Sequence, residues 1–151
     1  MTKYLCANCD VEITSHHGRS RAKARGYGYC SQSCEAAVKK RRAYENLPMR
    51  VLSLVDMRDD DECWPFKGRL NHGYGVVDCS GRHLLAHRVV FQVIKQIDPA
   101  GLVVCHSCDN PICCNPGHLW LGTQADNLRD MWAKGRGKAT IANLNRRGWL
   151  K

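Results

Sequence analysis

The stretch CHSCDNPICCNPGHLWLGTQADN, residues 105–127, decides the fold, because it brings four cysteines, two histidines and three asparagines into one short run. Such a run can form a disulfide knot, a structural zinc site, or a catalytic centre built around a zinc ion. The chain opens MTKYLCANC without an apolar signal segment and has no apolar run of membrane length, so we expect a cytoplasmic location and no membrane partner. In that reducing compartment, clustered cysteines usually bind metal.

The size and charge of the chain favour a small protein with a polyanionic partner. Its 151 residues suffice for one ordinary domain, or for one small domain with an added module. Twenty-three lysines and arginines stand against fourteen acidic residues, a formal charge of +9, and nucleic acid is the first candidate partner. A charge of this size also keeps a small protein in solution, so charge alone does not decide the function.

Three residues of the decisive stretch have the spacing of zinc ligands. They follow the pattern Cys108-x4-Cys113-x4-His118, and each intervening loop is long enough to turn around one ion. A structural zinc takes four ligands, and we expect Cys63 to be the fourth, because it begins the hairpin that should pack beside this loop. Two further cysteines of this part, Cys79 and Cys114, are interpreted as small buried hydrophobic residues.

His106 is the histidine that this ligand set leaves free. It lies at the end of an expected strand, beside Cys105, whose side chain should point to the opposite face of that strand. Asn127 falls in the first turn of the following helix, on the side that faces the strand. A free imidazole can take a proton from water while an amide oxygen holds a hard cation against a phosphate, and these two residues suit that chemistry.

The N-terminal part predicts a second zinc site. Its cysteines form two pairs, Cys6-x-x-Cys9 and Cys30-x-x-x-Cys34, at a separation typical of a tetrahedral four-thiolate site. His16 and His17 are reserve ligands. The segment HHGRSRAKARGYGY between the pairs is interpreted as a basic loop, and EAAVKKRRAYENL, residues 35–47, as a helix that ends at Pro48.

Basic residues of both segments are candidates for contacts with DNA phosphates, and a merely solvated surface is the equally weighted alternative. They are Arg21, Lys23, Arg25, Lys39, Lys40, Arg41 and Arg42. We expect this module to help to select or grip the target.

From residue 63 onward the chain alternates short strands with helices. The expected elements are a strand at 74–79, a turn at Ser80-Gly81, a strand from His83, a helix over 86–97, strands at 101–106 and 118–122, and a helix that begins with a capping box at Thr123 and ends at Gly135. Leu128, Met131 and Trp132 should form the apolar face of the last helix.

The pattern His106-x-Cys108-x4-Cys113-x4-His118-x8-Asn127 resembles the His-Cys box of the HNH, or ββα-metal, nucleases. The run CDNPICCNPGHLWLGTQADNLRDM is similar to HNH endonucleases of phages and mobile introns, and the elements CWPFKG, GYG and AHR extend the resemblance over roughly residues 63–137. The resemblance implies an α+β fold with a small zinc-stabilised ββα-metal core, preceded by a hairpin and a helix. It also implies a hydrolase that cleaves double-stranded DNA.

Carried over position by position, the resemblance implies that His106 is the general base that activates water. It implies that Asn127 binds a catalytic magnesium or another divalent cation, and that the zinc ligands are Cys108, Cys113 and His118, completed by Cys63. Relatives often have Asp or His just before the catalytic histidine as a second metal ligand, whereas Cys105 is a soft thiol poorly matched to magnesium. The chain therefore resembles the subset in which one asparagine and the DNA phosphates hold the metal.

His87 and Arg88 of the AHR element align with a basic pair that lies near the active site of relatives. Arg88 or Arg82 is a candidate to steady the charge that develops on the phosphate. A contact with the DNA backbone that has no chemical consequence is the equally weighted alternative for these residues.

We therefore divide the chain into an N-terminal zinc module at 1–47, a linker at 48–62, a nuclease domain at 63–137 and a basic tail at 138–151. The leading hypothesis is a metal-dependent DNA endonuclease with two structural zinc ions. The alternative is a non-catalytic zinc protein that binds DNA. The biological role can equally be homing, phage genome processing or restriction. We expect a prokaryotic or phage-infected host. A homodimer would allow both strands to be cut.

Overall fold

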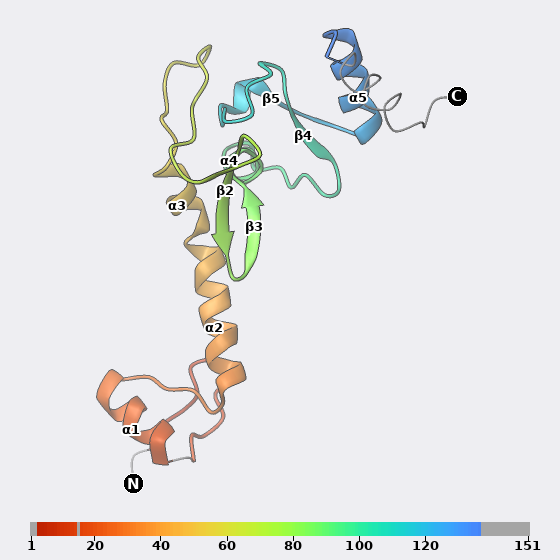
Figure 1. The fold of residues 1–151 in the computed structure, drawn as a ribbon. Coiled ribbons are helices and arrows are strands. Elements are labelled where there is room, and N and C mark those ends of the chain that lie inside the picture. Colours follow the sequence, from red (N-terminus) through yellow and green to blue (C-terminus); the bar gives the residue numbers. More distant parts are fainter. Residues whose placement is uncertain (1–2, 15, 137–151) are drawn as a thin grey trace. The chain divides into compact units, whose positions relative to one another are not determined.

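The computed structural model describes residues 3–14 and 16–136, which form two compact units. The first unit comprises the described residues up to 50 together with 78–83, and the second comprises 51–77 together with those from 84 onward. The elements, in the chain order seen in Figure 1, are α1 (His16–Arg25), α2 (Gln32–Glu45), α3 (Leu47–Leu52), β1 (Leu70–Asn71), β2 (Tyr74–Cys79), β3 (Arg82–Leu85), α4 (Ala86–Lys95), β4 (Val103–His106), η1 (Pro116–His118), β5 (Leu119–Gly122) and α5 (Gln124–Ala133).

The segment interpreted as a basic loop contains a helix, α1, so that prediction was wrong. Arg, Lys and Ala are strong helix formers, and Gly26, with a φ of 75°, follows the last helical residue. The helix lacks the apolar stripe by which helices are recognised in sequence. Among its described side chains only Ala22 is buried, where it packs with Cys6 and Ile13 in the small core of the first unit.

The next helix, α2, lies where a helix was expected, but its bounds differ from the prediction. It begins after Ser31, whose hydroxyl accepts a hydrogen bond of 3.2 Å from the backbone N–H of Cys34. It ends at Glu45, and Pro48 lies in the first turn of α3. The fixed φ of proline suits the first turn of a helix, so Pro48 both stops one helix and starts another.

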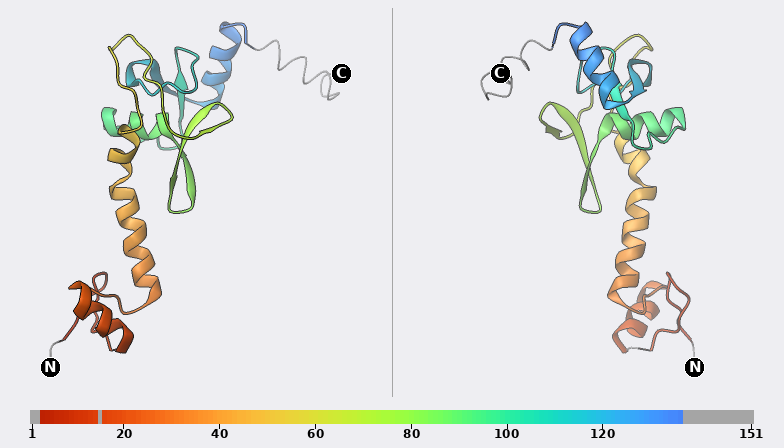
Figure 2. Two further views of the ribbon diagram at one scale, coloured as in Figure 1. Left: turned by 60° about the vertical axis from the view of Figure 1, so that its left-hand side comes forward. Right: turned by 90° about the vertical axis from the view of Figure 1, so that its right-hand side faces the viewer.

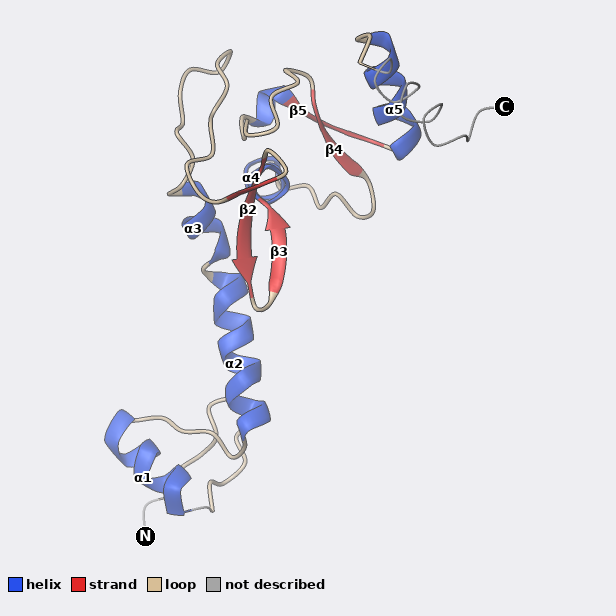
Figure 3. Cartoon of the chain, viewed as in Figure 1, coloured by secondary structure: helices blue, strands red, loops and turns tan. Residues whose placement is uncertain are grey.

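Between α3 and β1 the chain runs as a long loop, visible in tan in Figure 3. The strands that follow form a three-stranded sheet in the order β1-β2-β3. The helix α4 then begins at Ala86, as expected, but ends at Lys95, before Ile97, because Gln96 adopts a left-handed conformation with a φ of 57°.

A two-stranded antiparallel ribbon, β4 with β5, carries the decisive stretch of sequence. Its register pairs Val103 with Gly122 and His106 with Leu119. Phe91 of α4 packs with Val104 and Leu119 in the core of the second unit. Two further views show α4 and α5 beside this ribbon (Figure 2). The predicted α+β fold with a strand, strand, helix order is therefore confirmed.

The last helix, α5, begins with the predicted capping box, since Thr123 and Asp126 bond each other's backbone N–H groups. The side chains expected to form its apolar face are not buried: no residue of α5 is buried, and Leu128 and Trp132 are 43% and 47% exposed. Polar contacts hold its end instead, because the ammonium of Lys134 donates to the carbonyl of Ser107 at 3.0 Å. Within the described residues, no helix is long and apolar enough to cross a membrane.

Candidate functional site

Four side chains of the second unit form a cluster able to hold a metal ion. The ligand atoms of Cys63, Cys108, Cys113 and His118 all lie within 4.8 Å of one another. The Nδ1 atom of His118 is 3.7 Å from the sulfur of Cys63 and 3.7 Å from that of Cys113. Tetrahedral zinc with ordinary bond lengths places neighbouring sulfur and nitrogen ligands about 3.6 Å apart. The predicted ligand set, including the distant Cys63, is therefore assembled at a spacing compatible with one metal ion.

Asn115 positions this cluster, and the sequence prediction did not include it. The side chain is 2% exposed, and its amide nitrogen donates to the backbone carbonyls of Asp60 and Glu62, at 2.8 and 2.6 Å. Its amide oxygen accepts the backbone N–H of Gly117 at 2.8 Å. These bonds fasten the segment that leads into Cys63 to the loop that carries the other ligands. The Asn-Pro-Gly sequence at 115–117 is typical of a turn and could have indicated that the side chain of Asn115 bonds nearby backbone groups.

The first unit holds the second predicted cluster, formed by Cys6, Cys9, Cys30 and Cys34. The sulfur of Cys30 lies 3.6 Å from that of Cys9 and 3.5 Å from that of Cys34. A disulfide needs a bond of about 2.05 Å, whereas thiolates around one zinc lie about 3.8 Å apart, so the spacing fits metal and not a disulfide. The side chains of the reserve ligands, His16 and His17, lie outside the described part of the chain.

His106 and Asn127 line one cavity of about 440 Å³ in the second unit. The other predicted catalytic residues that line it are His87 and Arg88. Arg82, in contrast, begins β3 at the hairpin turn and belongs to the first unit. The fold therefore brings the predicted base, the predicted amide ligand and the AHR element to a single pocket.

The ring of His106 is oriented by the loop that carries Cys113. Its Nε2 atom lies 3.0 Å from the backbone carbonyl of Cys113, and since a carbonyl only accepts, Nε2 carries the hydrogen of the neutral ring. The Nδ1 atom is then left with its lone pair available. Burial lowers the pKa of His106, which favours the neutral form that can accept a proton. The residue that orients this ring is itself a member of the metal cluster.

His87 lies against His106, with 4.6 Å between the ring centroids. Burial, followed by the charges of His106 and Arg88, lowers the pKa of His87 to about 3, so this ring is neutral near pH 7. A backbone hydrogen bond with Val104 acts in the opposite direction and raises the pKa of His87. One ring nitrogen therefore has the carbonyl of Val104 as its partner. The other, Nδ1, is buried without a hydrogen-bond partner among the described residues.

Cys105, at the position where relatives often have a second hard metal ligand, stays a neutral thiol. It is 4% exposed, and burial raises its pKa, with further increases from the charges of Asp130 and Asp126. A protonated sulfur is a poor ligand for a hard cation. Asn127 lines the same pocket, and its amide oxygen is better suited to magnesium than the thiol of Cys105.

Among the other residues that line the pocket, Tyr74, Asp109 and Arg136 carry polar groups that were not predicted. The guanidinium of Arg136 bonds Asp109 at 3.0 Å and Asp130 at 2.7 Å, so its charge is already paired. The guanidinium of Arg88 donates to the carbonyl of Leu102 at 3.0 Å, which ties the AHR element to the segment before β4. Arg136 lies just beyond the predicted end of the last helix. No sequence pattern there indicates that it pairs with Asp109 and Asp130.

The basic residues of α2 are exposed, but most already have partners within the first unit. Lys39 bonds Glu35 at 2.8 Å and Arg41 bonds Glu45 at 3.7 Å, whereas Arg42 lies 5.7 Å above the ring of Tyr27. Such exposed pairs are weak and can be exchanged for a phosphate.

Residues 84–129 match the HNH endonuclease family. The match covers the AHR element, the ribbon and the first turns of α5, but not Cys63. No solved structure matches the chain.

Two curated relatives from Escherichia phage T7 match over 77 residues each. Protein 2.8 is 48% identical, over 49% of this chain and 52% of its own length. Protein 7.7 is 42% identical, over 50% of this chain and 59% of its own length. The chain thus spans somewhat more than half the length of each relative.

Proposed function

We propose that this protein is a metal-dependent DNA endonuclease that hydrolyses backbone phosphodiesters, because residues 84–129 match the HNH endonuclease family. The observation that carries the proposal is the bond from Nε2 of His106 to the carbonyl of Cys113, which leaves Nδ1 free in a pocket that Asn127 also lines. A zinc scaffold without catalysis has no need of a free, oriented imidazole beside an amide.

In this mechanism, Nδ1 of His106 takes a proton from a water molecule as the water oxygen attacks phosphorus. One O–P bond forms, the bond to the leaving oxygen breaks, and the negative charge on the phosphate rises in between. Arg88, whose guanidinium borders the pocket, is the candidate to steady that charge. The neutral Cys105 takes no part in the chemistry.

The amide oxygen of Asn127 would hold a divalent cation together with phosphate oxygens of the DNA. When bound, this cation supplies charge stabilisation for the phosphate and the leaving oxygen. One neutral protein ligand binds magnesium weakly, so we expect the cation to be retained only in the presence of DNA.

The direct experiment incubates the purified protein with supercoiled plasmid and magnesium and separates nicked from linear product. We expect nicking by one centre, and linear product if a homodimer places two centres on the two strands. DNA that is bound but stays intact under all divalent cations would favour the alternative of a non-catalytic zinc protein.

Replacing Asn127 should weaken the binding of the catalytic cation and so lower the rate of cleavage. We expect Asn127→Ala to lower cleavage on the order of 10²-fold or more, with partial recovery at high magnesium, because the cation loses its ligand from the protein. Asn127→Asp restores an oxygen ligand and should keep the rate within about tenfold of the parent. Cleavage rates measured across a magnesium titration decide this. Equal rates for the alanine variant and the parent would remove Asn127 from the site.

We expect His87 to contribute to cleavage through its Nδ1 atom, which has no hydrogen-bond partner among the described residues. We propose that Nδ1, which is buried in this structure, becomes accessible when DNA binds and then accepts a hydrogen bond from the water that His106 deprotonates, and so orients that water. An asparagine places its amide oxygen near the position of Nδ1, whereas a glutamine places its amide group near Nε2 and can still donate to the carbonyl of Val104.

We therefore expect His87→Gln to lose about tenfold in cleavage rate while it keeps its thermal stability, since one hydrogen bond in the transition state is worth about 1.4 kcal/mol at this factor. His87→Asn should melt at a lower temperature but cleave faster than the glutamine variant. The reverse order of the two rates would mean that His87 only anchors α4 to β4.

We keep the division into a module at 1–47, a linker at 48–62, a nuclease domain at 63–137 and a tail at 138–151 as a proposal. The tail lies outside the described residues. In this division the four-thiolate cluster belongs to a module that binds DNA, and Cys63 is the first residue of the nuclease domain.

A further inference from the structure

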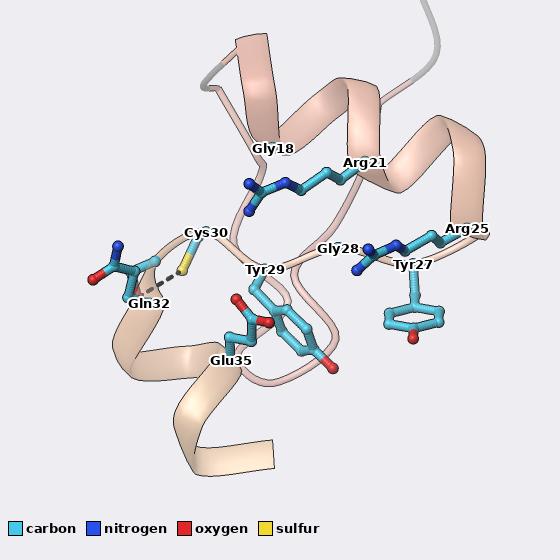
Figure 4. A pocket seen from close by; sticks show the side chains of 10 residues that line it. Gly18, Arg21, Arg25, Tyr27, Gly28, Tyr29, Cys30, Gln32 and Glu35 are labelled. Atoms are coloured by element: carbon cyan, nitrogen blue, oxygen red, sulfur yellow. Dashed lines mark hydrogen bonds between the residues drawn. The ribbon is translucent and has the colours of Figure 1, made fainter. Parts of the chain in front are cut away.

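The first unit contains a second cavity, of about 190 Å³, beside the four-cysteine cluster (Figure 4). Two guanidinium groups, of Arg21 and Arg25, border it one helical turn apart on α1. The start of α2 borders it from the other side with Ser31 and Gln32. The cavity therefore has positive charge on one wall and the positive end of a 14-residue helix on the other.

The two arginines have no ion pair of their own within the described part of the chain. Glu35 also lines the cavity, but its carboxylate bonds Lys39 at 2.8 Å. The hydrogen bond and the charge of Lys39 lower the pKa of Glu35, with smaller effects from the charges of Arg21 and Arg25. Both guanidinium groups thus face an acid that already has a closer partner, and their donors remain available to an anion.

Tyr27 and Tyr29 supply the apolar part of the wall. Their rings are 6.0 Å apart in an edge-on arrangement, and the charged end of Arg42 lies 5.7 Å over the ring of Tyr27. Arginine donors in a forked arrangement match the oxygens of a phosphate. An anion of that size fits the cavity of about 190 Å³.

We propose that this cavity binds one backbone phosphate of the DNA, held jointly by Arg21 and Arg25 at the start of α2. The inference rests on the proposed DNA substrate and adds the place and the chemistry by which the N-terminal unit grips it. Lys39 can then stay on Glu35, which keeps the acid from competing for the arginines.

The test uses the full chain carrying His106→Ala, so that duplex DNA stays intact, and measures binding by fluorescence anisotropy at several salt concentrations. We expect Arg21→Gln with Arg25→Gln to reduce the slope of log affinity against log salt by about 0.9, the loss of one phosphate contact. Because both arginines hold the same phosphate, the double variant should lose less affinity than the two single variants added together. The matched control for each single variant is Arg19→Gln, which removes one charge from the same helix outside the cavity and should alter the slope far less.

A second variant tests the sign of the effect. Glu35→Gln removes the acid from the cavity wall, so DNA binding should tighten, whereas Glu12→Gln, an exposed acid paired with Lys3 elsewhere in the unit, should not tighten it. The proposal would be overturned if the double arginine variant kept the slope of log affinity against log salt and lost zinc to a chelator faster than the parent. The arginines would then only offset the charge of the four thiolates. If the parent binds duplex DNA and these variants bind it equally well, this inference fails alone. If the parent binds no DNA, the proposed function fails with it.

Discussion

Replacing His106 with alanine should reduce DNA cleavage by about 10²- to 10⁴-fold, the usual contribution of a positioned general base. Folding should survive, because the side chain makes one hydrogen bond to the backbone of Cys113 and is no member of the metal cluster. DNA binding should survive as well, since a neutral ring neutralises no phosphate. Plasmid nicking under single-turnover conditions measures the first effect, and anisotropy with intact duplex measures the second.

The matched control for this variant is His83→Ala. His83 is an exposed histidine that bonds Asp78 in the hairpin and lies outside the pocket. Its loss should leave the cleavage rate within a factor of about two, since exposed pairs contribute little to stability. Equal cleavage by His106→Ala and His83→Ala would show that His106 is not the base.

Replacing Cys113 with serine should have the largest effect on stability. A structural zinc contributes on the order of 10 to 16 kcal/mol in small peptides, comparable with the net stability of about 5 to 15 kcal/mol of a whole domain. The core cluster at the ribbon is small, formed by Phe91, Val104 and Leu119 with Leu121 packed against it, so we expect the ribbon to depend on the metal. We expect this variant to bind one zinc per chain in place of two, to lose the folded ribbon and to lose all cleavage.

Elemental analysis and circular dichroism during a chelator titration check this prediction. Cys114→Ala is the matched control, because it removes the adjacent buried thiol, which is no member of the cluster. That variant should retain two zinc ions. A protein that keeps its melting temperature after complete removal of zinc would contradict the structural role of the metal.

The metal clusters could be predicted from sequence because ligand chemistry is strict. Zinc takes four soft or borderline ligands, and only a few cysteines and one histidine had the right spacing, so even Cys63, 45 residues before Cys108, could be assigned. The capping box at Thr123 was equally accessible, because it depends on two residues at a fixed interval.

Features that depend on tertiary contacts could not be predicted. Asn115 matters because two carbonyls more than fifty residues away converge on its amide, with sequence separations of 55 and 53. The unpaired Nδ1 of His87 exists only because α4 buries this ring against His106. The exposure of α5 could not be predicted for a related reason: ion pairs of Lys134 and Arg136, which sequence pattern does not reveal, hold the end of the helix.

The central claim is that one zinc ion holds the scaffold through three sulfurs and one imidazole, which leaves the neighbouring imidazole free to activate water. A crystal structure of the zinc-loaded protein, with anomalous data collected at the zinc edge, tests it most directly. We predict a zinc peak bonded to Cys63, Cys108, Cys113 and Nδ1 of His118, with His106 still bonded through Nε2 to the carbonyl of Cys113. A zinc ion bonded to His106, in place of any of these four ligands, would contradict the account.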